Sequence, residues 1–121
     1  MLNNLVELQK EIFKERNLIV VKECNGGSII KYGPRGVYQE NELDGKVESG
    51  VFISVEETYR RNGSSENQSI YISIARVEKH SSGCGTVMTL DKIKVYSKFT
   101  LNKQTKMINK IIDKYFEEFH K

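Results

Sequence analysis

The sequence predicts one α+β domain over residues 1–121, with an N-terminal helix, an antiparallel meander sheet of about six strands and a C-terminal helix. Three observations support this prediction. Apolar residues recur at helical spacing near both ends of the chain, they alternate with period two in between, and short turn-forming stretches separate the alternating segments. Strands joined by short loops pair antiparallel. We expect both helices to pack on one sheet face, because their apolar stripes need a surface to cover.

The first helix is predicted from Leu5, Leu8 and Ile12, which are spaced as on one side of a helix. The Asn-x-x-Glu pattern at residues 4–7 has the spacing of a capping box, in which two side chains satisfy free backbone N–H groups at a helix start. Asn17 is expected to end the helix. The element should therefore bury one apolar stripe and expose its charged residues.

Turn signals separate the first extended segments. Asn25-Gly26 is the strongest short hairpin signal in the chain, because a type I′ turn needs positive φ at both central positions. The Gly-Pro-Arg-Gly stretch at residues 33–36 predicts a second turn, and Asp44-Gly45 predicts a third after the extended segment 37–43. We therefore expect three short strands before residue 51.

Three longer extended segments follow. Residues 51–61 and 69–79 alternate between apolar and polar side chains on either side of a polar hairpin loop. The glycine-containing stretch 81–85 then leads to the last segment, residues 86–99. In that segment the apolar positions change parity around Asp91-Lys92, so we expect a β-bulge there.

A second helix is predicted from near Thr100 almost to Lys121. Its expected apolar stripe comprises Leu101, Ile108, Ile112, Tyr115 and Phe119. The opposite side carries a row of lysines, namely Lys103, Lys106, Lys110 and Lys114. Such a row could lie along a phosphate backbone, or it could be the solvated side of an amphipathic helix.

Composition and charge limit the classes of protein to consider. The chain is 38% hydrophobic and 29% charged, which favours a globular fold over disorder. Residues 86–121 hold eight lysines and four acidic residues, a balance of +4, whereas residues 1–85 balance at −1. Any positive field should therefore arise from the last third of the chain.

Targeting and redox signals favour a cytoplasmic protein of a bacterium or virus. The first residues lack the uninterrupted apolar stretch of a signal peptide, and no segment has the length of a membrane span. Cys24 and Cys84 are expected to be free thiols in a reducing compartment. We therefore expect no membrane association.

Strand parity points to one candidate binding surface. In each of the three long segments the β-branched residues share one face, which places one aromatic residue on the face that the helices leave open. These aromatic residues are Phe52, Tyr71 and Tyr96. The cations expected around them are Lys94, Lys98, Arg60, Arg61 and Arg76, with Arg35 displayed at the tip of a Pro-Arg-Gly turn.

Aromatic rings interleaved with cations suit more than one partner. Single-stranded nucleic acid stacks bases on such rings while lysines neutralise its phosphates. A flat protein interface, including that of a homodimer, uses the same rings for their large contact area. A third alternative is that a helix or a loop such as residues 33–47 covers this face.

A catalytic alternative depends on His80 and Cys84, as in a small hydrolase or transferase. A cysteine nucleophile needs a lowered pKa and an oriented base, and one strand with its loop rarely brings three such groups together. The potential soft ligands Cys24, His80, Cys84 and His120 lack metal-site spacing, and no phosphate-binding glycine motif is present. We therefore expect no metal and no cofactor, and a structural turn at Cys84.

The sequence thus favours a small non-enzymatic binding protein that uses the aromatic and basic sheet face and the lysine-rich helix. Its partner would be a protein, such as a host nucleic-acid-handling protein that a phage or mobile element inhibits. The alternatives are single-stranded nucleic acid itself and the small Cys/His enzyme.

Overall fold

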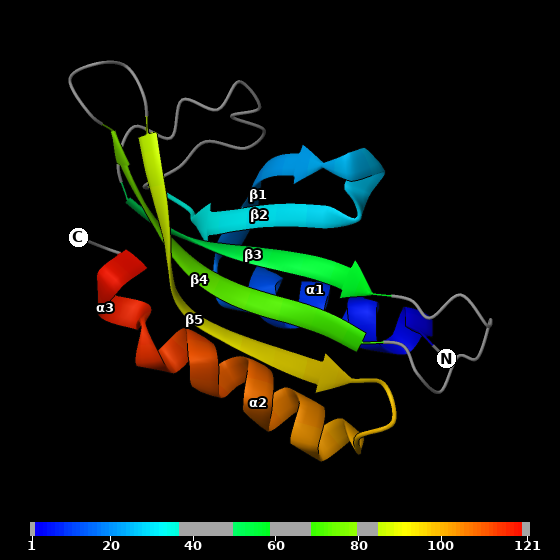
Figure 1. Cartoon of the computed structure of the whole chain (residues 1–121). Helices are drawn as coiled ribbons and strands as arrows, with labels where there is room; N and C mark the ends of the chain where they lie inside the picture. Colours follow the sequence, from blue (N-terminus) through cyan, green and yellow to red (C-terminus); the bar gives the residue numbers. More distant parts are fainter. Residues whose placement is uncertain (1, 37–49, 59–68, 80–84, 120–121) are drawn as a thin grey trace.

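The computed structural model describes residues 2–36, 50–58, 69–79 and 85–119, and confirms the α+β class (Figure 1). In chain order its elements are α1 (Leu2–Glu15), β1 (Leu18–Cys24), the 3₁₀ turn η1 (Asn25–Gly27), β2 (Ile29–Pro34), β3 (Gly50–Thr58), β4 (Ser69–Lys79), β5 (Gly85–Tyr96), α2 (Leu101–Lys114) and α3 (Phe116–Phe119). Within these residues no helix has the length and apolar character that crossing a membrane requires.

The strands form one antiparallel sheet in the order β1-β2-β3-β4-β5, so consecutive strands are neighbours and the meander is confirmed. The described sheet has five strands and not the expected six. The remaining expected strand, residues 37–43, lies outside the described residues. β1 and β5 are the two edges of the described sheet.

The helices cover one face of the sheet. In Figure 1, α1 lies behind the strands and α2 runs below β5, so neither helix stands in front of the sheet. The helix-covered face is apolar because alternate strand residues are β-branched, and these pack with α1, α2 and Phe119. The core residues of β3 and β4 are Val51, Ile53, Val55, Ile70, Ile72 and Ile74.

The C-terminal end of α1 lies where the sequence predicts it, whereas the N-terminal end does not. Leu5 and Ile12 are buried, as the helical spacing predicts, and Asn17 ends the helix with φ 58°. Asparagine is one of the few residues that adopts this left-handed conformation readily. The predicted capping box at residues 4–7 is wrong, because the helix already begins at Leu2.

The β1–β2 connection is a hairpin, but its conformation differs from the predicted type I′ turn at Asn25-Gly26. Positive φ falls on Gly26 (68°) and Gly27 (94°), one residue later than expected. Both positions are glycine, which adopts such angles without steric cost. The predicted turn at residues 33–36 also begins late, since β2 continues through Pro34.

The β4–β5 pair contains the expected bulge. Ile74 pairs with Asp91 and Ala75 with Thr89, which leaves Leu90 as the extra residue of β5. The bulge therefore lies one residue before the predicted Asp91-Lys92 position. Side chains beyond it change faces relative to those before it.

The C-terminal helix is shorter than predicted and is broken. α2 starts at the N-cap Thr100, whose Oγ1 accepts a 3.2 Å hydrogen bond from the Lys103 N–H. It ends at Tyr115, whose N–H bonds to the Ile112 carbonyl in a tightened last turn, and α3 follows. Leu101 was expected in the apolar stripe, but it is 66% exposed.

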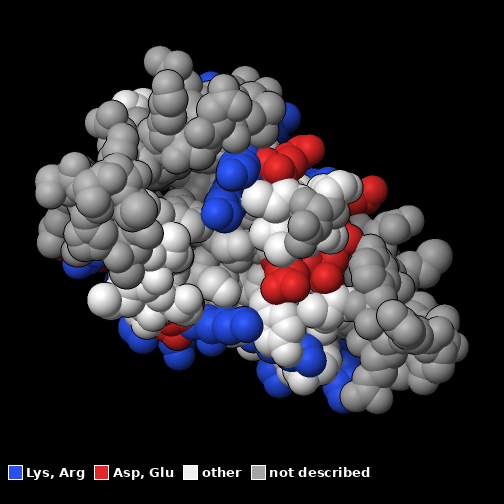
Figure 2. All heavy atoms as spheres, turned by 45° about the horizontal axis from the view of Figure 1, so that its top comes forward, with Lys and Arg blue, Asp and Glu red and all other residues white. Residues whose placement is uncertain are grey.

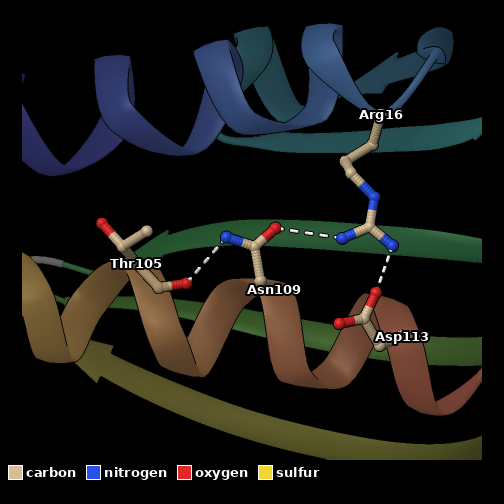
Figure 3. Close-up of polar contacts among 4 residues, drawn as sticks. All are labelled: Arg16, Thr105, Asn109 and Asp113. Carbon is tan, nitrogen blue, oxygen red and sulfur yellow. Dashed lines mark hydrogen bonds and ion pairs between the residues drawn. The ribbon is translucent and has the colours of Figure 1, made fainter.

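A polar bridge joins α1 to α2 (Figure 3). The Arg16 guanidinium donates one hydrogen bond to Asn109 Oδ1 at 3.0 Å and another to the Asp113 carboxylate. Asn109 in turn donates to the Thr105 carbonyl at 3.1 Å. The bridge fixes the end of α1 against the middle of α2, and so helps to hold both helices on the same sheet face.

Candidate functional site

The outer sheet face is defined here as the face opposite α1 and α2. Strand register identifies its members, because directly paired residues of antiparallel strands point to the same side. Its described members include Lys22, Lys31, Phe52, Ser54, Glu56, Tyr71, Ser73, Ala75, Lys92, Lys94 and Tyr96. The parity prediction for all three aromatic residues is therefore correct.

A lysine–tyrosine cluster lies over β4 and β5 on this face. It comprises Tyr71, Tyr96, Lys92, Lys94 and Lys98. The ammonium groups of Lys92 and Lys94 lie 4.2 Å and 5.0 Å from the centre of the Tyr71 ring. Lys94 and Lys98 lie 4.9 Å and 5.2 Å from the centre of the Tyr96 ring. Rings and cations therefore alternate without a gap from Lys92 to Lys98.

The cluster continues past the end of β5. The Phe99 ring packs edge-on against Tyr96, with ring centres 5.2 Å apart and an interplanar angle of 69°. Lys103 places its ammonium 3.8 Å from the centre of the Phe99 ring. The first lysine of the predicted α2 row therefore contacts the ring that adjoins Tyr96.

Gln104 positions the turn that carries Phe99. Its Nε2 donates to the carbonyl oxygens of Phe99 at 2.9 Å, Ser97 at 3.2 Å and Tyr96 at 3.4 Å. The side chain is 7% exposed, so these bonds are shielded from water. The amide thereby fixes the path between β5 and α2.

Hydrogen bonding with Tyr71 raises the pKa of Lys94, and the proximity of Tyr96 acts in the same direction. Lys94 is therefore fully charged at neutral pH. A row of paired residues crosses the whole sheet and ends at Lys92 of this cluster, in the order Lys22, Lys31, Ser54, Ser73 and Lys92. In Figure 2, blue Lys and Arg side chains and red Asp and Glu side chains both lie near the middle of the face shown.

Phe52 has the predicted parity but is not an exposed ring. It is 4% exposed, and Lys31 lies 5.1 Å from its ring centre. Its paired neighbour Ala75 is buried as well, as are Ile19 and Val21 of β1. Phe52 is therefore not the exposed ring that the sequence analysis expected.

Arg76 lies on the helix-covered face and not on the outer sheet face. Its parity matches that of Ile72 and Ile74, and its guanidinium donates to the Glu118 carboxylate of α3 at 3.1 Å. The prediction that it supplements the aromatic face is wrong. Its described contact holds α3 near the end of the sheet.

The remaining sheet-associated candidates lie elsewhere. Arg35 is exposed, and its backbone N–H donates to the Asn17 carbonyl at 2.8 Å, which joins the end of β2 to the turn after α1. Arg60 and Arg61 lie outside the described residues. The catalytic candidates His80 and Cys84 also lie outside them.

All four lysines of the predicted α2 row, Lys103, Lys106, Lys110 and Lys114, are exposed. Lys110 and Lys114 also line a groove of about 300 Å³ between α2 and β5. Lys114 also forms a 3.1 Å ion pair with Asp91. The groove is otherwise lined by Asp91, Ile93, Met107 and Ile111.

Lys92, Phe99 and Gln104 are site residues that the sequence analysis missed. The bulge at Leu90 directs Lys92 to the outer face, and its position was the signal that could have identified this lysine. Phe99 follows the last strand and so has no strand parity to use. In the part of the chain that the structure describes, no group of His, Cys, Asp and Glu side chains is arranged to hold a metal ion.

Comparisons with known protein families, with curated proteins and with solved structures found no match to this chain.

Proposed function

We propose that this chain is a non-enzymatic binding protein that holds an anionic macromolecule on its outer sheet face. The observation that carries the proposal is the lysine–tyrosine cluster, in which Lys92, Lys94 and Lys98 surround two partly exposed rings. Lys22 and Lys31 add two further cations to the same face. A face of one charge attracts and orients a partner of the opposite charge.

The charge distribution supports a partner on this face in preference to the helices. The outer-face members named above and Lys98 together carry five lysines and one acid, Glu56. On α1, in contrast, acidic and basic residues are mixed, as Glu7, Lys10, Glu11 and Lys14 show. Mixed charges produce little net field, so α1 provides a matched comparison surface.

Retention on a heparin column tests the proposal, because heparin is a soluble sulfated polyanion that needs no knowledge of the natural partner. We expect the K92E/K94E variant to elute at a much lower salt concentration than the unmodified chain. The K10E/K14E variant changes net charge by the same amount on α1, and should elute close to it. Equal losses in the two variants would show that only net charge matters, and would contradict a role for this face.

The enzymatic alternative rests on His80 and Cys84, and Cys84→Ser separates it from the binding proposal. We expect this variant to retain heparin binding unchanged. A measurable activity that is lost in a folded Cys84→Ser chain would favour the small hydrolase or transferase instead.

A further inference from the structure

We infer that the partner of the outer sheet face is single-stranded nucleic acid, with bases stacked on Tyr71, Tyr96 and Phe99. This inference rests on the proposed function and specifies its partner. The three rings form a continuous path, since Tyr71 and Tyr96 share contacts with Lys94 and Tyr96 packs against Phe99. We call Tyr71, Tyr96 and Phe99 the aromatic path.

The aromatic path is open to a ligand. All three rings are partly exposed. Tyr71 and Tyr96 lie on the outer sheet face, and Phe99, which also packs against the core, follows directly after β5. Lysine ammonium groups lie over the three rings. At exposed sites such groups bind ring faces only weakly. A nucleobase stacks on such a ring more strongly than an ammonium group binds to it. This stacking does not depend on which base is present, because each base has a π face.

The lysines that lie over the rings would contact the phosphates of a strand whose bases stack there. Lys92, Lys94, Lys98 and Lys103 accompany the aromatic path from β4 to the first turn of α2. Each is held next to a ring, so a strand that stacks its bases there brings its phosphates within reach of the same ammonium groups. Open sheets that bind single strands stack two or three bases in this manner.

The same observations argue against a duplex and against an acidic protein. A duplex keeps its bases stacked on one another, so it offers the rings nothing to stack on. A protein interface needs a buried apolar centre and avoids charge there. Phe52 of this face is already buried, and lysines surround the exposed rings. The exposed Val87 shares the face but pairs with Val77, at the other end of β4 from Tyr71. A basic nucleic-acid-binding groove on a host protein would be repelled.

Fluorescence anisotropy with a labelled oligothymidylate of about ten nucleotides tests the inference directly. We expect binding whose logarithmic affinity falls with log salt at a slope of about −3, since roughly four phosphates each contribute about −0.7 on a single strand. A duplex of equal length should bind at least roughly tenfold more weakly at the same salt concentration. Tyr71→Ala should weaken oligothymidylate binding roughly tenfold, while Tyr71→Phe, which keeps the ring, should bind as the unmodified chain does.

Two further probes make the outcomes distinguishable. Equal or tighter binding of poly-glutamate would identify an acidic protein surface as the partner and overturn this inference, while the proposed function would stand. Equal affinity for duplex and single strand, with Tyr71→Ala unaffected, would also overturn the stacking path. Failure to bind heparin, oligothymidylate and poly-glutamate alike would overturn the proposed function as well. Circular dichroism melting of each variant checks that lost binding does not reflect lost folding.

Discussion

The Lys92 ammonium lies 4.2 Å from the centre of the Tyr71 ring, although Tyr71 is paired with Lys94 in the strand register. Lys92 is paired with Ser73, a small residue that leaves room for the lysine to lean over the neighbouring ring. The arrangement depends on the bulge at Leu90. Before the bulge Met88 pairs with Arg76 on the helix-covered face, and after it Lys92 and Lys94 point to the outer face.

Phe52 and Tyr71 lie on the same sheet face but should differ sharply in their effect on stability. Phe52 is 4% exposed, so Phe52→Ala should lower the free energy of unfolding by about 3–5 kcal/mol through lost burial and a cavity. Tyr71 is partly exposed, and Tyr71→Ala should cost clearly less. Urea denaturation measures both values. Equal losses would mean that Tyr71 is a core residue, and would remove it from the binding surface.

The hydrogen bonds from Gln104 to the turn that carries Phe99 should stabilise the fold. Gln104→Leu keeps a side chain of similar size but removes the amide that donates to the Tyr96, Ser97 and Phe99 carbonyl oxygens. We expect unfolding to become about 1–3 kcal/mol easier. Thr105→Ala is the control at the adjacent position, because Thr105 bonds only within its own helix among the described contacts. If Gln104→Leu melts like the control, the amide does not fix the β5–α2 connection.

Asp91 should make stability depend on pH in acid. A hydrogen bond from Lys114 lowers the pKa of the Asp91 carboxyl, and bonds from Tyr115 and the Lys92 N–H act in the same direction. A folded pKa below the unfolded value means that the carboxylate stabilises the fold above the unfolded pKa of about 4. That contribution is lost as the pH falls through the folded pKa.

The comparison of Asp91 with its neutral isostere isolates this effect. Asp91→Asn should unfold more easily than the unmodified chain at pH 7, and the difference should shrink as the pH falls below about 4. Urea denaturation at a series of pH values measures it. A difference that is constant down to pH 2 would show that the charge of Asp91 does not contribute.

Arg16 and Asp113 should show a measurable but small coupling across the two helices. Their side chains form an ion pair, and Arg16 also bonds to Asn109 and lies 5.9 Å from the Phe116 ring centre. A double-mutant cycle with Arg16→Ala and Asp113→Ala should give a coupling energy of about 0.5 kcal/mol at low salt. Additive effects of the two substitutions would show that the Arg16–Asp113 ion pair does not stabilise the α1–α2 contact.

The order of elements was predictable because periodicity and turn residues are local signals. Leu5 and Ile12 are buried on α1, and Ile70, Ile72 and Ile74 are buried on β4, as their spacing indicates. The helix break at Tyr115 was not predictable, since the apolar residues on both sides of it keep the same helical spacing. The turn angles at Gly26 and Gly27 were missed because two glycines allow several registers of the same hairpin.

The candidate site was predictable only in part. Parity placed Tyr71, Tyr96 and Lys94 on the outer face correctly, because alternation is strict along a regular strand. Phe52 has the same parity but is buried, and burial depends on tertiary contacts that the alternation of one strand does not encode. Phe99 and Gln104 join the site through tertiary contacts after the last strand, where no periodicity applies.

A titration of the ¹⁵N-labelled chain with a heparin oligosaccharide, followed by backbone amide chemical shifts, tests the location of the proposed binding surface most directly. We expect the largest changes at Tyr71, Lys92, Lys94, Tyr96 and Phe99, and little change at Lys10 and Lys14 of α1. Added salt should reverse the changes, since exposed charges are screened. Changes confined to α1, or to Lys106 and Lys110 of α2 without β4 and β5, would contradict binding on the outer sheet face.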